Sequence, residues 1–452
     1  MNVQRKLILG AALGSAALAL ATLGLAGSAS ANPPGSGAAA TVALQWNANA
    51  LAAVRAAKVV DPPGTAPRAI YQTEGLLDMS YVQAAVYDAA TKIGHRYVPY
   101  HHFSAAAGNA SIEAAVIAAA FNALVYYVGD PTGALATDYK TSIDALPNDM
   151  RRARGIAVGE AAAADIEALR GNDGRYGPSP PGLGAPTNPV QPGVWVWAPP
   201  PSLQIAQTPW MATMQPFMIE STSQFRAPPP PALTSAQYAA DLNETKAYGS
   251  ATSAVRTPEE TAIAYFWNAN ATSQLNQTLQ NVATQHHMDL IDTVRLLAAG
   301  NMVSTDAGMA CFDSKYTHRF WRPVTAIRNA DLDGNSATSA DPAWTPLVTT
   351  PNHPEYPSQH GCVTSALAQV LANAVGSTSI DATVPGATGG GTTLTTTQTF
   401  ATVNDLLTQL VNARVWIGFH YRNSVVRGEN LGTSVANWAL QRYFLPTHEN
   451  GG

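Results

Sequence analysis

Basic and polar side chains gather in three short segments near the C-terminal end of this chain of 452 residues. The segments are Lys315 with Arg322, then Pro357-Ser358-Gln359-His360, and then Arg414 with His420. Three fixed positive side chains, a hydroxyl, backbone N–H groups and two imidazoles are what a tetrahedral, multiply charged anion needs to be held out of water. The order and spacing therefore predict one oxyanion site. We refer to its residues as the cage: Lys315, Arg322, Ser358, Gln359, His360, Arg414 and His420.

The three segments resemble the superfamily that unites vanadium-dependent haloperoxidases with type 2 phosphatidic acid phosphatases. The family pattern is Lys, six residues, Arg-Pro; then Pro-Ser-Gly-His; then Ser-Arg, five residues, His, three residues, Asp. The first motif fits in full. The second has Gln359 in place of Gly, and the third has Ala413 and Ser424 in place of Ser and Asp. The resemblance covers residues 315 to 424 and is more specific to the superfamily than to one reaction.

The resemblance implies a role for each residue of the cage. The residues that would hold the oxygens of vanadate are Lys315, Arg322, Ser358, Gln359 and Arg414. His420 would be the single covalent ligand to vanadium, His360 the acid–base group, and Lys315 would also polarise the bound peroxide. In a phosphatase the same site would hold phosphate, and His420 would be the nucleophile that becomes phosphorylated.

Two further positions help to choose between these reactions. His353 lies where bromoperoxidase-like members carry a second His, which favours bromide or iodide over chloride; a surface His in a Pro-rich loop is the alternative. The family Asp that is expected to orient His420 is Ser424 here, so another acceptor, such as a backbone carbonyl, would have to set the tautomer. A nucleophilic imidazole depends more on an orienting carboxylate, so Ser424 favours the haloperoxidase over the phosphatase.

Local patterns predict how the cage residues are positioned. On one helix Lys315 and Arg322 would fall within ~20° of one face and ~10 Å apart along the axis, and Pro323 would end that helix at Arg322. The second motif precedes an apolar-periodic run, which places Ser358 at a helix N-terminus, where an anion is favoured. Gly418 allows a turn between Arg414 and His420.

Composition limits the partners and the location of the protein. Residues 1–31 read as a secretory signal that ends in Ala29-Ser30-Ala31, with an uncleaved membrane anchor as the alternative. Cleavage would leave 23 basic and 30 acidic residues and a formal net charge of −7. Without a basic stripe, nucleic acid is not expected as a partner. No His-Glu-x-x-His, Cys-x-x-Cys or Walker-type motif indicates a zinc hydrolase, redox or nucleotide site.

Alanine-rich, 3.6-periodic stretches predict an all-α fold of helical bundles, with the anion site in the C-terminal bundle. The predicted helices are 77–92, 110–128, 151–169, 236–248, 258–268, 273–300, 364–375 and 402–416. Pro-rich breaks at 178–201 and 228–231 divide the chain into an N-terminal helical region, 32–230, and a C-terminal domain, 231–452. The stretch from Gly386 to Thr397 is expected to be a flexible surface loop. Trp195, Trp197 and Trp210 are expected to pack on a helical surface.

The sequence therefore favours an exported vanadate-dependent haloperoxidase that oxidises a halide with hydrogen peroxide, and it leaves open a small organic substrate. An acid phosphatase with the same site is the first alternative, and a helical protein that only binds an oxyanion is the second. Cys311 and Cys362 either form a disulfide or stay as buried thiols. A homodimer is compatible with large Ala-rich bundles.

Overall fold

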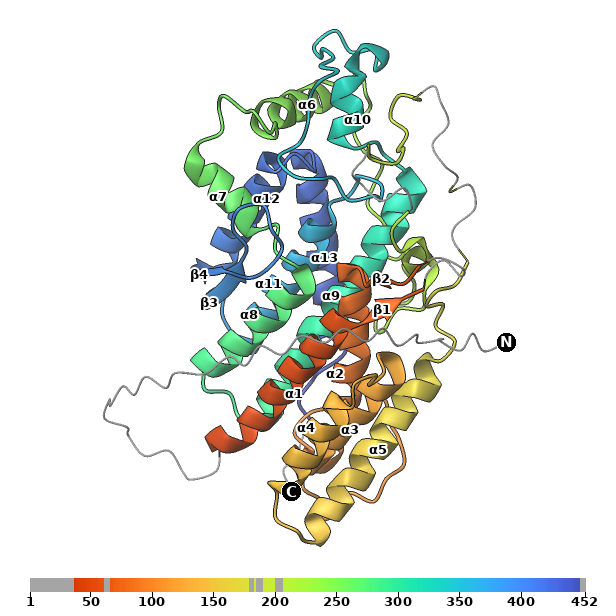
Figure 1. The fold of residues 1–452 in the computed structure, drawn as a ribbon, viewed down its shortest axis with the longest axis vertical. Helices are drawn as coiled ribbons and strands as arrows, with labels where there is room; N and C mark the ends of the chain where they lie inside the picture. Colours follow the sequence, from red (N-terminus) through yellow and green to blue (C-terminus); the bar gives the residue numbers. More distant parts are fainter. Residues whose placement is uncertain (1–35, 61–65, 179–182, 184–189, 200–205, 448–452) are drawn as a thin grey trace, which may run out of the picture.

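The computed structural model describes residues 36–60, 66–178, 183, 190–199 and 206–447. Over these residues the chain is mainly helical, with thirteen α-helices and two pairs of short strands, which confirms the predicted all-α class (Figure 1). No helix in the described ranges is long and apolar enough to cross a membrane. The predicted signal segment, 1–31, and part of the Pro-rich break at 178–201 lie outside the described residues.

The N-terminal elements are five helices and one two-stranded sheet. They are α1 (Ser36–Ala56), β1 (Lys58–Val59), β2 (Arg68–Ala69), α2 (Gln72–Gly94), α3 (Ile112–Tyr127), α4 (Ala134–Asp144) and α5 (Met150–Arg170). Helix α3 packs against α2 and α5, and these elements form the lower part of the view in Figure 1. The small side chains of α3, such as Ala115 and Ala119, are fully buried, and small residues let neighbouring helices approach closely.

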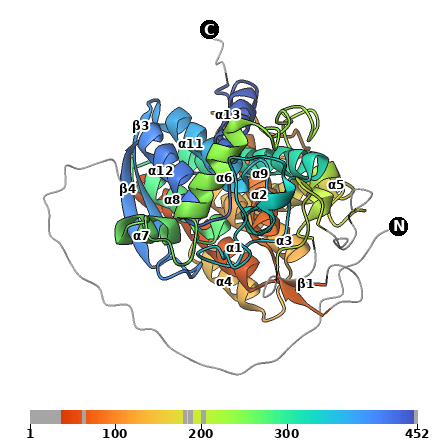
Figure 2. The ribbon, with the colours of Figure 1, turned by 90° about the horizontal axis from the view of Figure 1, so that it is seen from above.

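The C-terminal elements are eight helices, two 3-10 turns and one hairpin. They are η1 (Pro209–Thr213), α6 (Ala236–Tyr248), α7 (Pro258–Phe266), α8 (Ala271–Gln285), α9 (Leu290–His318), α10 (Pro323–Arg328), η2 (Ala330–Leu332), α11 (Gln359–Val375), β3 (Ser379–Gly386), β4 (Thr396–Thr402), α12 (Val403–Trp416) and α13 (Arg422–Leu440). Seen from above, the antiparallel hairpin β3–β4 lies at one side of the molecule and α5 at the opposite side (Figure 2).

Helix α9 connects the two groups of elements. It is 29 residues long and packs against α1 and α2 as well as against α8, α11 and α13. One hydrophobic cluster accordingly includes Leu77 of α2, Leu297 of α9 and Leu371 of α11. The proposed domain boundary at residue 230 stays a prediction. Because α9 is buried for most of its length, the position of Lys315 in its last turn is fixed from several sides.

One prediction about local structure is wrong, and another is confirmed in part. The single helix predicted over 273–300 is broken: α8 ends at Gln285, His287 adopts a left-handed φ of 50°, and Asp289 caps α9 by accepting from the N–H of Asp292 at 2.9 Å. The stretch from Gly386 to Thr397, predicted as a loop, is a loop over 387–395, and only its ends belong to β3 and β4, a hairpin that was not predicted. Helices α1, α4 and α13 were missed by the periodicity analysis.

Close contact between α11 and α13 brings two of the site segments together. A Cβ at Gly432 of α13 would lie 1.9 Å from the carbonyl oxygen of Cys362 on α11, so only glycine permits this approach. Cys311 and Cys362 are both buried, free thiols in the structure. Trp195 and Trp210 are buried, as predicted, and Trp197 is partly buried against the same core.

Candidate functional site

The fold brings the three segments to one cavity of about 760 Å³. Six of the predicted site residues line it: Arg322, His353, Gln359, His360, Arg414 and His420. Lys315 and Ser358 are not among the lining residues and are fully buried. The rim includes residues from distant parts of the chain, among them Tyr71 and the Gly389-Gly390 pair of the β3–β4 loop.

Lys315 and Arg322 reach the cage from different elements, so the prediction of one shared helix face is wrong. Helix α9 ends at His318 because Arg319 turns into the left-handed region, with φ 47°. Arg322 then adopts an extended conformation as the N-cap of α10, as expected for a residue before proline. Lys315 Nζ donates to the carbonyl oxygens of Pro354 and Glu355, both at 2.9 Å. An ammonium has three donors, so one is left for a ligand.

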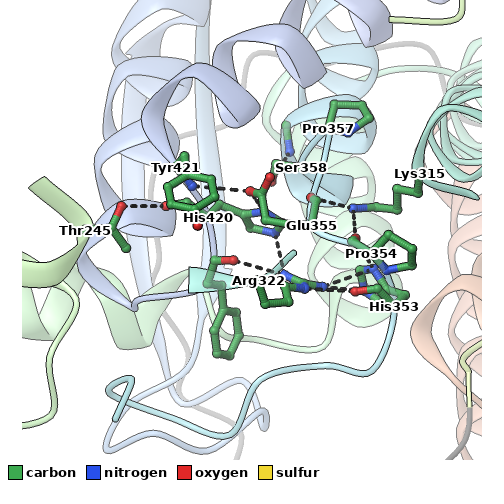
Figure 3. A network of polar contacts seen from close by, with 12 residues as sticks. Thr245, Lys315, Arg322, His353, Pro354, Glu355, Pro357, Ser358, His420 and Tyr421 are labelled. Atoms are coloured by element: carbon green, nitrogen blue, oxygen red, sulfur yellow. Dashed lines mark hydrogen bonds and ion pairs between the residues drawn. The ribbon is translucent and has the colours of Figure 1, made fainter. Parts of the chain in front are cut away.

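Arg322 is held by backbone carbonyls on two sides (Figure 3). Its Nε donates to the carbonyl oxygen of His353 at 2.9 Å, and its Nη1 donates to that of Phe419 at 3.0 Å. Its Nη2 lies 3.1 Å from Nδ1 of the His353 ring. His353 is only 8% exposed, so the alternative of a surface histidine is wrong.

The second motif begins a helix, as predicted. Ser358 is the N-cap of α11, and its Oγ accepts from the N–H of Gly361 at 3.4 Å. Gln359 is the first helical residue, where backbone N–H groups have no partner within the helix. Nε2 of His360 is buried and has no hydrogen-bond partner among the described residues. The imidazole lines the cavity, so this nitrogen is available to a bound molecule.

The third motif is divided by a turn, also as predicted. Arg414 lies in the last turn of α12, where its Nη1 donates to the carbonyl oxygen of Trp267 at 2.9 Å. Its Nε is buried without a partner in the described parts of the chain. Gly418 has a φ of 81°, and a Cβ there would lie 2.5 Å from the carbonyl oxygen of Gly249. The turn brings His420 into the cage beside Arg322, whose Nη1 lies 3.4 Å from His420 Nε2.

The hydrogen-bond partner of His420 Nδ1 is a carboxylate, whereas a backbone carbonyl was the example that the sequence analysis gave. His420 Nδ1 lies 2.7 Å from Oε1 of Glu355, and both side chains are buried. Sequence reasoning missed Glu355 because the two residues are 65 positions apart. A usable signal was present: an acidic residue in an apolar, Pro-rich segment, three positions before Ser358. Because a carboxylate does lie beside His420, the replacement of the family Asp by Ser424 no longer argues against a phosphatase.

Burial dominates the electrostatics of the cage. It lowers the pKa of Lys315 to about 8, that of Arg322 to about 10 and that of Arg414 to about 9. It also raises the pKa of Glu355 to about 7, although the charges of Lys315 and Arg322 act in the opposite direction. Three buried cations thus face one buried carboxylate, and a buried excess of positive charge is costly without an anion.

Burial, reinforced by the neighbouring cations, lowers the pKa of the two cage histidines, His360 and His420, and that of His353 beside them. Their imidazoles are therefore neutral at pH 7 and offer lone pairs. With the spare N–H of Lys315, the unpartnered Nε of Arg414 and the N-terminus of α11, the donors suit a tetrahedral oxyanion such as vanadate or phosphate.

Comparison with known proteins gives matches in both sequence and fold. Residues 295–447 match the VCPO second helical-bundle domain. The vanadium chloroperoxidase of Curvularia inaequalis is 25% identical over 142 residues, which are 26% of this chain and 23% of that enzyme. The matched segment thus spans about a quarter of the fungal protein.

Solved structures of bacterial proteins share the fold. A vanadium-dependent iodoperoxidase has a TM-score of 0.72 at 18% identity and covers 92% of this chain and 98% of its own. A vanadium-dependent chloroperoxidase in its apo form has a TM-score of 0.65 at 20% identity, and the match covers 82% of this chain and 93% of the chloroperoxidase chain. The domain match contains every cage residue, so this part of the chain is similar in sequence to a vanadium chloroperoxidase, and the fold is similar to those of the bacterial vanadium-dependent peroxidases.

Proposed function

We propose that this protein is an exported, vanadate-dependent haloperoxidase that oxidises a halide with hydrogen peroxide. The observation that carries the proposal is the buried, positively charged cage, in which Nδ1 of His420 is held by Glu355 while Nε2 faces Arg322. One neutral imidazole among three cations suits an anion that bears a metal, because the metal can take the imidazole lone pair while the cations take the oxygens.

Each residue then has a task that its contacts support. Vanadate, when bound, supplies the Lewis acidity that activates hydrogen peroxide toward a halide. Arg322 and Arg414 would hold its oxygens, together with the Ser358 hydroxyl and the N–H of Gln359. His420 Nε2 would hold the metal. The spare N–H of Lys315 would stabilise charge that develops on oxygen.

His360 is placed to move protons. The overall reaction, in which hydrogen peroxide, a halide ion and a proton give a hypohalous acid and water, requires a proton to be delivered. Nε2 of His360 is unpartnered, buried and at the cavity wall, so it can take a proton from peroxide and return it to the departing oxygen.

We further propose bromide or iodide as the preferred halide. His353 lines the same cavity as His360 and His420, and its ring is fixed between Arg322 and Phe312, whose ring centroid lies 5.4 Å away. The structural relatives include both an iodoperoxidase and a chloroperoxidase, so their names do not decide the halide. Export rests on the signal-like composition of residues 1–31.

A phosphatase is the second candidate, and one observation favours it. The Glu355 carboxylate supplies what a nucleophilic imidazole needs, a fixed partner at Nδ1 that leaves Nε2 free to attack. Phosphate and vanadate also share shape and charge.

The deciding experiment measures bromide, iodide and chloride oxidation by the purified protein with hydrogen peroxide, before and after loading with orthovanadate. Hydrolysis of p-nitrophenyl phosphate is measured in parallel. We expect vanadate-dependent oxidation of bromide or iodide that falls roughly 100-fold or more in His420→Ala, since even partners of a metal ligand are worth 10- to 100-fold. His102→Ala, which removes an exposed histidine, should keep the activity.

Two results would reject the proposal. Phosphate ester hydrolysis that vanadate inhibits, with no halide oxidation, would make the protein a phosphatase. Tight vanadate binding without either reaction would leave only an oxyanion-binding protein. Chloride oxidation as fast as that of bromide would reject the halide preference alone.

A further inference from the structure

Glu355 lies outside the three motifs, yet it contacts two of them (Figure 3). Its side chain is fully buried. Its carbonyl oxygen accepts from Lys315 Nζ at 2.9 Å, and its Oε1 accepts from the N–H of Tyr421 at 3.3 Å and faces His420 Nδ1 at 2.7 Å. One residue thus ties the end of α9 to the segment that carries His420.

The contacts of His420 fix its tautomer. A guanidinium can only donate hydrogen bonds, so Arg322 Nη1, 3.4 Å from His420 Nε2, requires a lone pair on that nitrogen. The proton of the neutral ring is then on Nδ1, where the Glu355 carboxylate accepts it. The two neighbours, on opposite sides of the ring, therefore require the same tautomer.

Ser424 does not share this task. It occupies the position at which the family resemblance leads one to expect an orienting Asp. It is 1% exposed, and its backbone oxygen accepts from the N–H of Ser358 at 3.0 Å. In the described part of the chain its hydroxyl makes no hydrogen bond to His420, and its side chain instead acts on Glu355, whose pKa it lowers. The carboxylate that the third motif lacks is supplied instead from the segment just before the second motif.

We propose that Glu355 is the positioning residue of His420. It holds the imidazole in the Nδ1–H tautomer with the Nε2 lone pair directed into the cage, and its negative charge strengthens Nε2 as a donor to the metal. The consequence for vanadate rests on the proposed function, whereas the tautomer can be observed in the protein alone.

Two substitutions separate the hydrogen bond from the charge. In Glu355→Gln the amide oxygen stays at the Oε1 position, because the N–H of Tyr421 also needs an acceptor there. The tautomer is kept and the charge is lost. Glu355→Met has a similar volume and removes both. Asp313→Asn is the matched control, since it removes another buried carboxylate, which pairs at 2.7 Å with Arg226, a residue outside the cage.

The first measurement is the ¹⁵N NMR spectrum of the histidine side chains without vanadate, in which His420 is assigned by its loss in His420→Ala. We expect the Nδ1–H form in the unchanged protein, in Glu355→Gln and in Asp313→Asn. In Glu355→Met the Nε2–H form should appear. The Nδ1–H form persisting alone in Glu355→Met, or the Nε2–H form in the unchanged protein, would overturn the assignment of the tautomer to Glu355.

The second measurement compares the binding of orthovanadate and of sulfate, which fits the cage but cannot bond to a nitrogen lone pair. Vanadate affinity should fall about 10- to 100-fold in both Glu355 variants, with sulfate affinity within about threefold of the unchanged protein. Equal losses for both anions would mean that Glu355 only maintains the cage, and no loss for vanadate would refute the effect of its charge. If the unchanged protein binds vanadate and sulfate with equal affinity, the proposed vanadate-dependent function is rejected. The NMR spectra still test the tautomer of His420 in that case. Should Glu355→Met not fold, Glu355→Gln alone decides on the charge.

Discussion

Two buried polar clusters lie along α9, and they differ in how completely their hydrogen bonds are satisfied. The first, the amide cluster, consists of Asn47, Asn276, Gln280 and Asn301. Its amides donate to one another at 2.6–3.0 Å, and none of its buried side-chain atoms lacks a partner. The second is the cage, where His360 Nε2 and Arg414 Nε have no partner among the described residues.

The difference distinguishes a cluster that stabilises the fold from one that binds. A neutral network in which every group is satisfied rigidifies a core and has no donor left for a ligand. Three buried cations with one carboxylate cost folding free energy, and natural proteins keep such a cost where function requires it. Mutations in the amide cluster should therefore lower stability and spare binding, and mutations in the cage should do the opposite.

The largest effect is expected from Arg414→Met. Orthovanadate affinity should fall about 100-fold because a charge-assisted hydrogen bond is lost. In anion-free buffer at pH 7 the free energy of unfolding should rise by roughly 1–2 kcal/mol, since burial, which lowers the pKa of Arg414 to about 9, opposes the charged form. Titration calorimetry and urea unfolding measure the two quantities.

Arg295→Met is the matched control for this experiment. Arg295 donates to the carbonyl oxygen of Phe444 at 2.8 Å and to Asn373 Oδ1 at 2.9 Å, away from the cage. Its replacement should leave vanadate affinity unchanged. If Arg414→Met instead unfolds more easily and binds vanadate normally, the cage is a structural cluster like the first one, and the contrast between them disappears.

Asn301→Leu should give the reverse result. The substitution keeps the branching of the side chain, although Leu is bulkier, and it removes the hydrogen bonds to Asn276, at 2.9 and 3.0 Å, and to the carbonyl oxygen of Leu297. Urea unfolding should show a loss of about 2 kcal/mol, because buried groups of its neighbours lose partners. Vanadate affinity should stay within about twofold. A large loss of affinity with little change in stability would show that the amide cluster is coupled to the site.

The sequence made the cage predictable because each motif is local and ordered along the chain. Ser358 at a helix N-terminus and the turn at Gly418 follow from short-range rules, and both are confirmed. The shared helix for Lys315 and Arg322 is wrong because Arg319, a non-glycine residue, adopts the left-handed conformation that ends α9. The residue types around Arg319 do not predict that the helix ends there.

Long-range contacts account for the rest of what the sequence did not predict. Glu355 and His420 have no periodic relation, so only the fold pairs them.

Helix α6 was predicted to the residue because Ser235 caps it and its pattern is regular. The gap between α8 and α9 was missed, although Asp289, three residues before Asp292, is a helix-start signal that deserved more weight.

The next effect separates the clusters by pH, because only the cage contains titrating groups. Burial lowers the pKa of Lys315 to about 8, and the protonated form binds the anion. The affinity for an anion should therefore be highest below pH 7 and fall about tenfold between pH 7 and pH 9, as the Lys315 ammonium loses its proton. Molybdate is the suitable probe, since its charge is constant over this range. Arg414, with a pKa of about 9, and Glu355, with a pKa of about 7, also titrate at the ends of this range. Lys315→Met should therefore bind more weakly and lose the part of the dependence that is centred near pH 8. If the molybdate affinity of the unchanged protein does not change between pH 7 and pH 9, the charge of Lys315 does not contribute to anion binding.

The smallest effect is expected at Gln359, where the family motif has glycine. The side-chain carbonyl of Gln359 is buried and unpartnered, and an acceptor oxygen repels an oxyanion. Its Nε2 lies beside Gly308 of α9, so we expect the residue to bind the anion through its backbone N–H at the start of α11. Gln359→Gly keeps that N–H. Vanadate affinity should change by less than about threefold, while the free energy of unfolding falls by roughly 0.5–1 kcal/mol from the greater freedom of glycine. A loss of affinity near that of Arg414→Met would instead show that the side chain itself binds. In that case the charged side chains and the unpartnered nitrogen atoms of the cage would not be enough to predict which residues bind the anion.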